Sequence, residues 1–207
     1  MRQFTKDDVT LLKKESLYEG FFKLNRYIFT HKLFAGGESK TVSREVFERG
    51  HAAAVLLYDP EREEIVFLEQ VRYPAIETND QPWLIEVVAG IIEDGENIED
   101  VCHREAAEEA GLELRNLTPI DSYLSSPGAS TERIYLYIAQ VDATRAEGIH
   151  GLEYEAEDIR VFSVSLATAR EWLDSGKIDN STAIIAVQWL FLNHHKIRLQ
   201  WGINERE

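Results

Sequence analysis

Residues 90–112 read GIIEDGENIEDVCHREAAEEAGL, and their spacing predicts a helix over Ile98–Ala110. At about 100° per residue, Val101 marks the face of this helix that should turn inward. Glu105 and Glu109 fall in the middle of the same face, although solvated carboxylates belong on the opposite one. The sequence therefore predicts a helix whose inward face becomes acidic over its last two turns.

Two buried carboxylates one helical turn apart are unfavourable unless another charge cancels theirs. A divalent cation is the simplest such charge, and a set of oxygen ligands favours magnesium or manganese over zinc. The alternative is an exposed acidic face made of Glu105, Glu108 and Glu109, with Arg104 as an ion-pair partner. The position of Glu105 and Glu109 on the inward face favours the metal site.

The composition indicates an acidic globular chain. Its 207 residues include 22 Lys and Arg against 37 Asp and Glu, which gives a formal net charge of −15. Such a charge repels phosphate backbones and argues against nucleic-acid binding, yet a cation in an acidic pocket can still hold a small phosphorylated ligand. The single cysteine, Cys102, suits a reducing compartment. Without a signal-peptide core or an apolar run of about 18 residues, we expect a cytoplasmic protein that does not contact membranes.

Short strands interrupted by three helices predict an α/β (α+β) fold in which a helix packs on a mixed sheet. The expected extended segments are Leu17–Phe29, Thr41–Phe47, Trp83–Val88, Ile134–Val141 and Ile159–Val164, with a hairpin formed by Ala52–Tyr58 and Ile65–Val71. The other two expected helices are Leu166–Leu173 and Thr182–Leu199.

The acidic helix also carries a family resemblance. From Gly90 the chain continues with five residues, Glu96, seven residues and then Arg104-Glu105-Ala106-Ala107-Glu108-Glu109-Ala110-Gly111-Leu112. This resembles the Nudix box, G-x5-E-x7-R-E-U-x-E-E-x-G-U, at every fixed position. The resemblance implies the Nudix fold, a mixed sheet sandwiched between helices. It also implies hydrolysis of a nucleoside diphosphate linked to a second group.

The resemblance further implies roles for single residues. Glu105 and Glu109 would be the principal metal ligands, the carbonyl of Ala89 another, and Glu108 would lie close by. Arg104 would hold the carboxylates in place by charge-assisted hydrogen bonds. The bound ion, Mg²⁺ with Mn²⁺ as a substitute, would neutralise the diphosphate and activate the attacking water.

Outside the box, the chain resembles the bacterial ADP-ribose pyrophosphatases over nearly its whole length. The matching stretches are Tyr18–Phe22, Arg44–Ala52, Glu69–Arg72, Ser125–Gly128, Gly148–Gly151 and Gly176–Asn180. The resemblance implies hydrolysis of ADP-ribose, and of related ADP-sugars, to AMP and ribose 5-phosphate. It also implies a homodimer in which a strand-rich segment, residues 1–50, is exchanged between subunits, while residues 51–207 form the hydrolase domain.

Substrate contacts follow from the same resemblance. Phe21 and Phe22 would reach the adenine from the partner subunit, since an aromatic ring stacks well on a purine. Without the resemblance, one of two adjacent phenylalanines would be core and the other interface. The remaining implied contacts are Arg44, Glu45, Arg72, Ser126, Pro127, Gly128 and Glu132.

The general base has to come from outside the helix, because metal occupies the helix carboxylates. Residues 148–158 form a glycine-bounded acidic loop that could close as a lid. By its place in that loop, Glu155 corresponds to the family's base and Glu157 to an additional metal ligand. Glu153 departs from the family pattern and is a rival base, and a solvated acidic loop is the alternative to any of these roles.

Two further functions stay open at the level of sequence. One is diphosphatase activity on another nucleotide sugar or dinucleotide, such as GDP-mannose or NADH. The other is a sensor that binds a nucleotide sugar without cleaving it, which would not need the complete set of Arg104, Glu105, Glu108 and Glu109.

Overall fold

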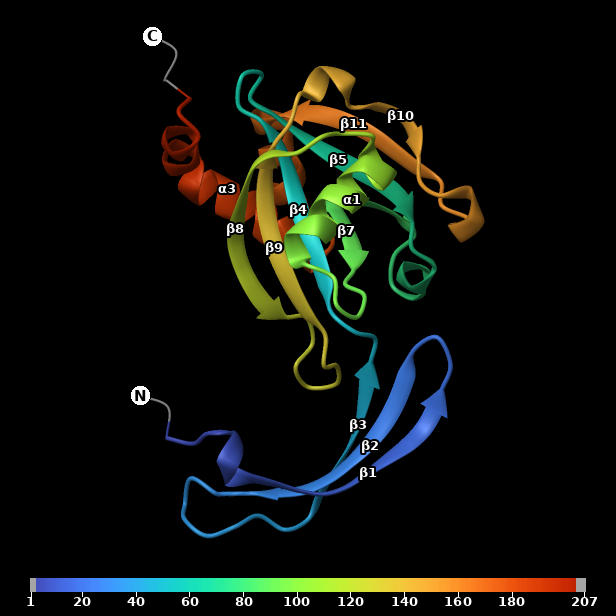
Figure 1. The fold of residues 1–207 in the computed structure, drawn as a ribbon, viewed down its shortest axis with the longest axis vertical. Helices are drawn as coiled ribbons and strands as arrows, with labels where there is room; N and C mark the ends of the chain where they lie inside the picture. The colour runs from blue at the N-terminus through green and yellow to red at the C-terminus, as the bar shows by residue number, and fades with distance from the viewer. Residues whose placement is uncertain (1–2, 204–207) are drawn as a thin grey trace. The chain divides into compact units, whose positions relative to one another are not determined.

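A computed structural model describes residues 3–203 of the chain, which divide into two compact units. The N-terminal unit contains the described residues up to His51 together with Leu124–Arg133. The main unit contains Ala52–Tyr123 and the described residues from Ile134 onward. Figure 1 draws the strands and helices of both units.

The N-terminal unit is built on a three-stranded antiparallel sheet in the order β1-β2-β3. Its strands are β1 (Val9–Glu19), β2 (Lys23–His31) and β3 (Val42–Glu48). The strand expected over Thr41–Phe47 is confirmed as β3. The single extended segment expected over Leu17–Phe29 is wrong, because the chain turns back at Gly20–Phe22. A Cβ atom at Gly20 would lie 2.4 Å from the hydroxyl of Tyr18, which packs over this turn as an exposed side chain.

The main unit contains an eight-stranded mixed sheet in the order β10-β11-β5-β4-β9-β8, with β6 paired to β5 and β7 paired to β4. The strands are β4 (Ala52–Asp59), β5 (Glu64–Val71), β6 (Trp83–Glu86), β7 (Val88–Ile91), β8 (Arg115–Leu124), β9 (Arg133–Gln140), β10 (Glu147–His150) and β11 (Ile159–Ser165). The predicted hairpin is confirmed by the antiparallel pairing of β4 with β5. The central strand β4 also pairs in parallel with β9, which makes the sheet mixed.

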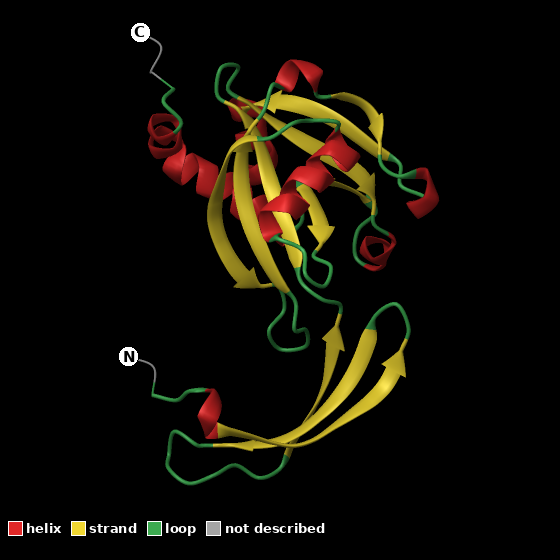
Figure 2. Ribbon diagram, in the orientation of Figure 1, coloured by secondary structure: helices red, strands yellow, loops and turns green. Residues whose placement is uncertain are grey.

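Helices cover both faces of this sheet (Figure 2). They are α1 (Ile98–Ala110), α2 (Leu166–Asp174) and α3 (Ser181–Gln200). Ala53, Val55 and Leu57 of β4 pack with α1, while the alternate residues of β4 pack with α2 and α3. Strand β4 is buried along its whole length for this reason. The expected fold, a mixed sheet sandwiched between helices, is confirmed.

Two strands of the sheet were not expected from the sequence, and a third is interrupted. Strand β8 contains Pro119 and many polar residues, and β10 lies inside the segment expected to be a loop. The strand expected over Trp83–Val88 is divided at Val87, where the chain leaves β5 and begins to pair with β4. Within the described residues, no helix is long and apolar enough to cross a membrane.

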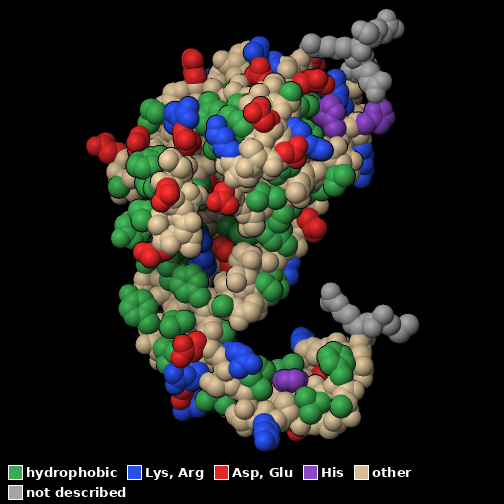
Figure 3. Space-filling model, turned by 180° about the vertical axis from the view of Figure 1, so that it is seen from behind, with side chains coloured by type: hydrophobic (Ala, Val, Ile, Leu, Met, Phe, Trp, Pro, Cys, Tyr) green, Lys and Arg blue, Asp and Glu red, His purple; other side chains and the backbone are tan. Residues whose placement is uncertain are grey.

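Figure 3 shows acidic and basic side chains interspersed over one face of the main unit. On this face the basic residues do not gather into a single patch.

Candidate active site

Local sequence signals set the length and rotation of α1. The side chain of Asn97 accepts a hydrogen bond from the Glu99 backbone N–H at 2.9 Å and caps the first turn. Gly111 ends the helix in the left-handed conformation, with φ at 65°. The helix between them packs Val101 and Ala106 into the core, so that Glu105 and Glu109 also face the sheet.

Glu109 is a buried carboxylate at the junction of α1 and β7. Its residue is only 4% exposed, and its Oε2 accepts a hydrogen bond from the Ala89 backbone N–H at 3.0 Å. Burial raises the pKa of Glu109 to about 8, the Ala89 hydrogen bond opposes that rise, and the nearby charges of Glu105 and Glu157 add to it. The acidic inward face expected of this helix is therefore present.

Glu105 lies directly against the backbone of Gly90. A Cβ atom placed on Gly90 would be only 1.7 Å from Oε1 of Glu105, so the carboxylate fills the space where a side chain would be. Burial raises the pKa of Glu105, and the neighbouring Arg104 guanidinium acts against that rise. The box glycine is thus required for close approach of the carboxylate to β7.

Arg104 is hydrogen-bonded to three carboxylates. Its Nη1 donates to Oε1 of Glu105 at 2.6 Å and to Oε2 of Glu108 at 3.3 Å, and its Nε donates to Oε1 of Glu96 at 3.3 Å. Glu96 in turn accepts from the backbone N–H of Glu93 at 2.8 Å, which lowers the pKa of Glu96. Arg104 thus bonds to Glu105 and Glu108, two of the carboxylates that the resemblance expects it to hold.

Arg72 is the one substrate residue expected from sequence that lies in the main unit. Its guanidinium donates to both oxygens of Glu86, from Nε at 3.0 and 3.1 Å and from Nη2 at 2.8 Å. Burial would lower the pKa of Arg72, but the Glu86 bonds raise it overall, and the charges of Glu109 and Glu157 contribute. Arg72 is thus fixed near the buried carboxylates. Glu86 could not be expected from the sequence, because only the pairing of β5 with β6 brings it beside Arg72.

Part of the acidic loop expected as a lid forms regular secondary structure. It begins with β10, and Gly151 (φ 100°) donates its backbone N–H to the Glu108 carbonyl at 3.2 Å. Glu157 folds inward, where its Oε2 accepts from the Leu152 backbone N–H at 3.1 Å. Glu153 and Glu155 are exposed on a single 3-10 turn. This arrangement separates Glu157 from the two candidate bases and leaves both of those accessible to water.

The other substrate residues expected from sequence belong to the N-terminal unit. Phe21 is 86% exposed, whereas Phe22 packs edge-on against Phe47 with 5.2 Å between ring centroids. Glu45 pairs with Arg26 at 3.1 Å, and the Arg44 guanidinium donates to the Ser43 carbonyl at 2.8 Å.

The loop at Ser126, Pro127 and Gly128 closes on itself in the same unit. The Ser126 carbonyl accepts from the backbone N–H groups of Ala129 and Ser130 at 3.0 and 2.8 Å. Glu132 is buried, and Arg49, which was not expected to be a site residue, lies 3.1 Å from it. The expected residues thus form two groups: a carboxylate cluster with Arg72 in the main unit, and an aromatic and polar group in the N-terminal unit.

The main-unit cluster has the chemistry of a divalent-cation site. Glu105, Glu109 and Glu157 supply only oxygen donors, and burial raises the pKa of Glu105 and of Glu109, an effect that a cation bound beside them would oppose. In residues 3–203, no three His, Cys, Asp or Glu side chains already converge as ligands. The present geometry accounts for this, since Glu105 and Glu108 point toward Arg104.

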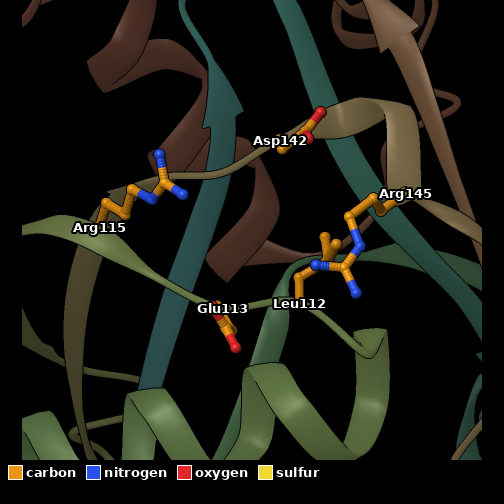
Figure 4. A pocket seen from close by; sticks show the side chains of 5 residues that line it. All are labelled: Leu112, Glu113, Arg115, Asp142 and Arg145. Atoms are coloured by element: carbon orange, nitrogen blue, oxygen red, sulfur yellow. The ribbon is translucent and has the colours of Figure 1, made fainter.

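A pocket elsewhere in the main unit is lined by Leu112, Glu113, Arg115, Asp142 and Arg145 (Figure 4). None of the expected site residues lines it. Hydrogen bonds from Thr144 lower the pKa of Asp142. The pocket is therefore lined by acidic and basic side chains together.

Comparisons with known proteins identify the family. A model of the NUDIX domain matches residues 48–181. The ADP-ribose pyrophosphatase of Escherichia coli (strain K12) is 52% identical over 199 residues, 96% of this chain and 95% of the relative. That of Haemophilus influenzae is 46% identical over 204 residues, 97% of this chain and 94% of the relative.

More distant relatives agree. A GDP-mannose pyrophosphatase of Escherichia coli O1:K1 / APEC is 32% identical over 191 residues, 90% of this chain and 96% of the relative. The crystal structure of an ADP compounds hydrolase superposes with a TM-score of 0.69 at 15% identity, covering 95% of this chain and 97% of that one, which supports the fold. Nudix pyrophosphatases generally depend on a divalent metal ion, and the buried carboxylates fit such an ion. The resemblance of residues 90–112 is therefore confirmed, and the chain belongs to the NUDIX family of hydrolases.

Proposed function

We propose that this protein hydrolyses the diphosphate bond of ADP-ribose in the presence of Mg²⁺. One water is consumed, and AMP and ribose 5-phosphate leave with the two phosphate groups divided between them. The buried pair Glu105 and Glu109 supports the reaction class, because burial raises the pKa of both carboxylates and a bound divalent cation would favour their ionised form. Identity of 46–52% over nearly the full length to ADP-ribose pyrophosphatases supports the substrate.

Glu105, Glu109, Glu157 and the carbonyl of Ala89 would hold the ion. Mg²⁺ suits this set because all the donors are oxygens, and Mn²⁺ would substitute. When bound, the ion would neutralise the diphosphate and lower the pKa of the attacking water. Arg104 and Glu108 keep the carboxylate group in place, and Arg72 contributes a fixed positive charge for the phosphates.

Glu155 would accept the proton of the attacking water. Its place on the turn at residues 153–155 exposes its carboxylate to solvent, where it can take up a proton. Glu153 lies on the same turn and is the rival base, whereas Glu157 is held inward by Leu152. Comparison of Glu155→Gln with Glu153→Gln distinguishes them, since only removal of the base should lower kcat sharply.

The adenine side of the substrate would be bound by the N-terminal unit. Phe21 has the free ring surface needed for stacking, and the resemblance adds Phe22, Arg44, Glu45, Ser126, Pro127, Gly128 and Glu132. We further propose a cytoplasmic homodimer in which residues 1–50 are exchanged, so that these side chains serve the partner's carboxylate cluster.

Product analysis tests the proposal. The protein is incubated with ADP-ribose and Mg²⁺, and chromatography should show AMP and ribose 5-phosphate appearing in equal amounts. Glu109→Gln, which has nearly the same shape, serves as the matched control and should release neither. The similarity to a GDP-mannose pyrophosphatase favours GDP-mannose as the second candidate substrate. Faster turnover of GDP-mannose than of ADP-ribose would replace the proposed substrate, and binding of ADP-ribose without cleavage would indicate a sensor.

A further inference from the structure

The acidic loop at residues 148–158 contacts helix α1 where the helix ends. The imidazole ring of His150, the last residue of β10, lies against Gly111: a Cβ atom built on Gly111 would be 2.6 Å from Cε1 of His150. The next residue, Gly151, donates its backbone N–H to the Glu108 carbonyl at 3.2 Å. The start of the loop therefore rests on the last turn of the helix that carries the buried carboxylates.

Two further contacts fix the His150 ring. Its Nε2 lies 2.9 Å from the Glu147 carbonyl, and because a carbonyl oxygen only accepts, Nε2 is the donor. The backbone of His150 pairs with Ile159 across β10 and β11. One ring atom is thus bonded within the strand, while its neighbour in the ring, Cε1, lies against the helix.

Beyond Gly151 the loop folds back on its own first residues. A Cβ atom built on Gly151 would be 2.6 Å from Cβ of Glu157. The Leu152 N–H donates to Oε2 of Glu157 at 3.1 Å, and the Glu157 N–H donates to the Leu152 carbonyl at 3.3 Å. The same carbonyl accepts from the Glu155 backbone N–H at 3.0 Å. Residues 151–157 therefore form a closed turn, whose position follows that of Gly151.

This closed turn carries both loop carboxylates to which a role is assigned, Glu155 as the base and Glu157 as a ligand of the cation. A general base has to lie within hydrogen-bond reach of the water that it deprotonates. Misplacement of a reacting group by about 1 Å can cost about 100-fold in rate. The contact of His150 with Gly111 joins the helix that holds the cation to the turn that holds the base, so it governs the distance between them.

We propose that His150 is a positioning residue for hydrolysis, which holds the closed turn on the end of α1 so that Glu155 reaches the attacking water. His150 acts through Glu155 and touches neither the substrate nor the cation. This inference rests on the proposed function, because it takes Glu155 to be the base. The step affected is the attack of water on a nucleoside diphosphate linked to a second group, and the effect is on kcat and not on affinity.

A double-variant cycle in kcat tests this role. Turnover of ADP-ribose at saturating Mg²⁺ is measured for His150→Ala, Glu155→Gln and the two combined, and calorimetry in EDTA gives Kd. We expect His150→Ala to lower kcat at least about tenfold while Kd stays within about twofold. The combined variant should be no slower than Glu155→Gln, because both changes act on the same base. In a Glu153→Gln background the loss from His150→Ala should remain in full.

Two substitutions separate the contacts of the ring. In His150→Gln the amide nitrogen can still donate to the Glu147 carbonyl, and in His150→Phe a ring still lies against Gly111. Each should recover part of the kcat lost in His150→Ala, and recovery in neither would count against the inference. His103→Ala is the matched control: His103 is exposed on α1, and its kcat should equal that of the unaltered protein.

The same contact can be disturbed from the helix. In Gly111→Ala the new methyl group would push the His150 ring aside, and alanine at a φ of 65° also strains the backbone. Gly176→Ala is the matched control, because its φ of 76° brings similar strain but a Cβ atom there meets nothing within 4 Å. Both variants should lower Tm, and only Gly111→Ala should lower kcat. Equal kcat in the two would show that the strain, and not the ring contact, matters.

Hydrogen exchange tests the anchoring without turnover. The Gly151 amide should exchange at least about tenfold faster in His150→Ala, while the Val101 amide inside α1 keeps its rate. Unaltered protein that does not cleave ADP-ribose would refute the proposed function, and the exchange rates would still test the anchoring. An unchanged Gly151 rate, or kcat losses that multiply when His150→Ala is combined with Glu155→Gln, would overturn the inference.

Discussion

Replacing Glu109 by glutamine should stabilise the metal-free protein while abolishing its activity. Glu109 is 4% exposed, and its pKa of about 8 in the fold compares with an ordinary value of 4.5. Glutamine has nearly the same shape, and its Oε1 can still accept the hydrogen bond from the Ala89 backbone. The substitution removes the buried charge and leaves the packing in place.

The magnitude follows from proton linkage. Between pH 4.5 and about 8 the unfolded chain has lost the Glu109 proton and the folded chain retains it, so stability falls as pH rises. The slope is about 1.4 kcal/mol per pH unit, which gives a difference of about 3 kcal/mol at pH 7. The difference should vanish near pH 4.5 and stop growing above about pH 8.

The assay is urea unfolding of EDTA-treated protein at several pH values between 5 and 8.5, with the free energy of unfolding extrapolated to water. Glu108→Gln is the control: its side chain is 31% exposed, and its free energy of unfolding should change by less than about 1 kcal/mol. Mg²⁺ should stabilise the unaltered protein and have little effect on Glu109→Gln. Parallel curves for the unaltered protein and Glu109→Gln across this pH range would refute the reasoning.

Three other predictions concern single contacts. Gly90→Ala should reduce kcat at least about 100-fold with the circular dichroism spectrum retained, because the new methyl group would displace the Glu105 carboxylate; near-normal turnover would show that this close approach is dispensable. Phe21→Ala should raise KM for ADP-ribose about tenfold without changing Tm, whereas Phe22→Ala should lower Tm, since only Phe22 packs on Phe47; equal effects on Tm would argue against this division. Arg72→Lys should raise KM for ADP-ribose about tenfold because lysine lacks the fork that bonds both oxygens of Glu86; an unchanged KM would place Arg72 outside the phosphate site.

Helix α1 could be predicted to the residue because its signals are local. Asn97 caps its first turn, Gly111 supplies the left-handed end, and the apolar period between them fixes the inward face. The same period predicts that Glu105 and Glu109 face the sheet, and this prediction needs no knowledge of tertiary contacts. This part of the candidate site can therefore be predicted from residues 97–111 alone.

Features that depend on pairing between distant segments could not be predicted in this way. Strand β10 forms because Gly148 and its neighbours pair with β11. The ion pair of Arg72 with Glu86 needs the register of β5 against β6. The contact of Arg49 with Glu132 could not be predicted for the same reason, since the bridge between Phe47 and Ser130 joins segments far apart in the chain.

The central claim, that Glu105 and Glu109 hold the cation on which hydrolysis depends, is tested most directly by the rate of AMP release during a Mg²⁺ titration. Protein stripped with EDTA should be inactive toward ADP-ribose and should recover full activity as Mg²⁺ is restored. Glu109→Gln should stay inactive at every concentration, because the neutral amide lacks the negative charge that would hold the cation at this buried position. AMP release by the stripped protein, or recovery of Glu109→Gln at the unaltered protein's rate and Mg²⁺ dependence, would contradict the claim.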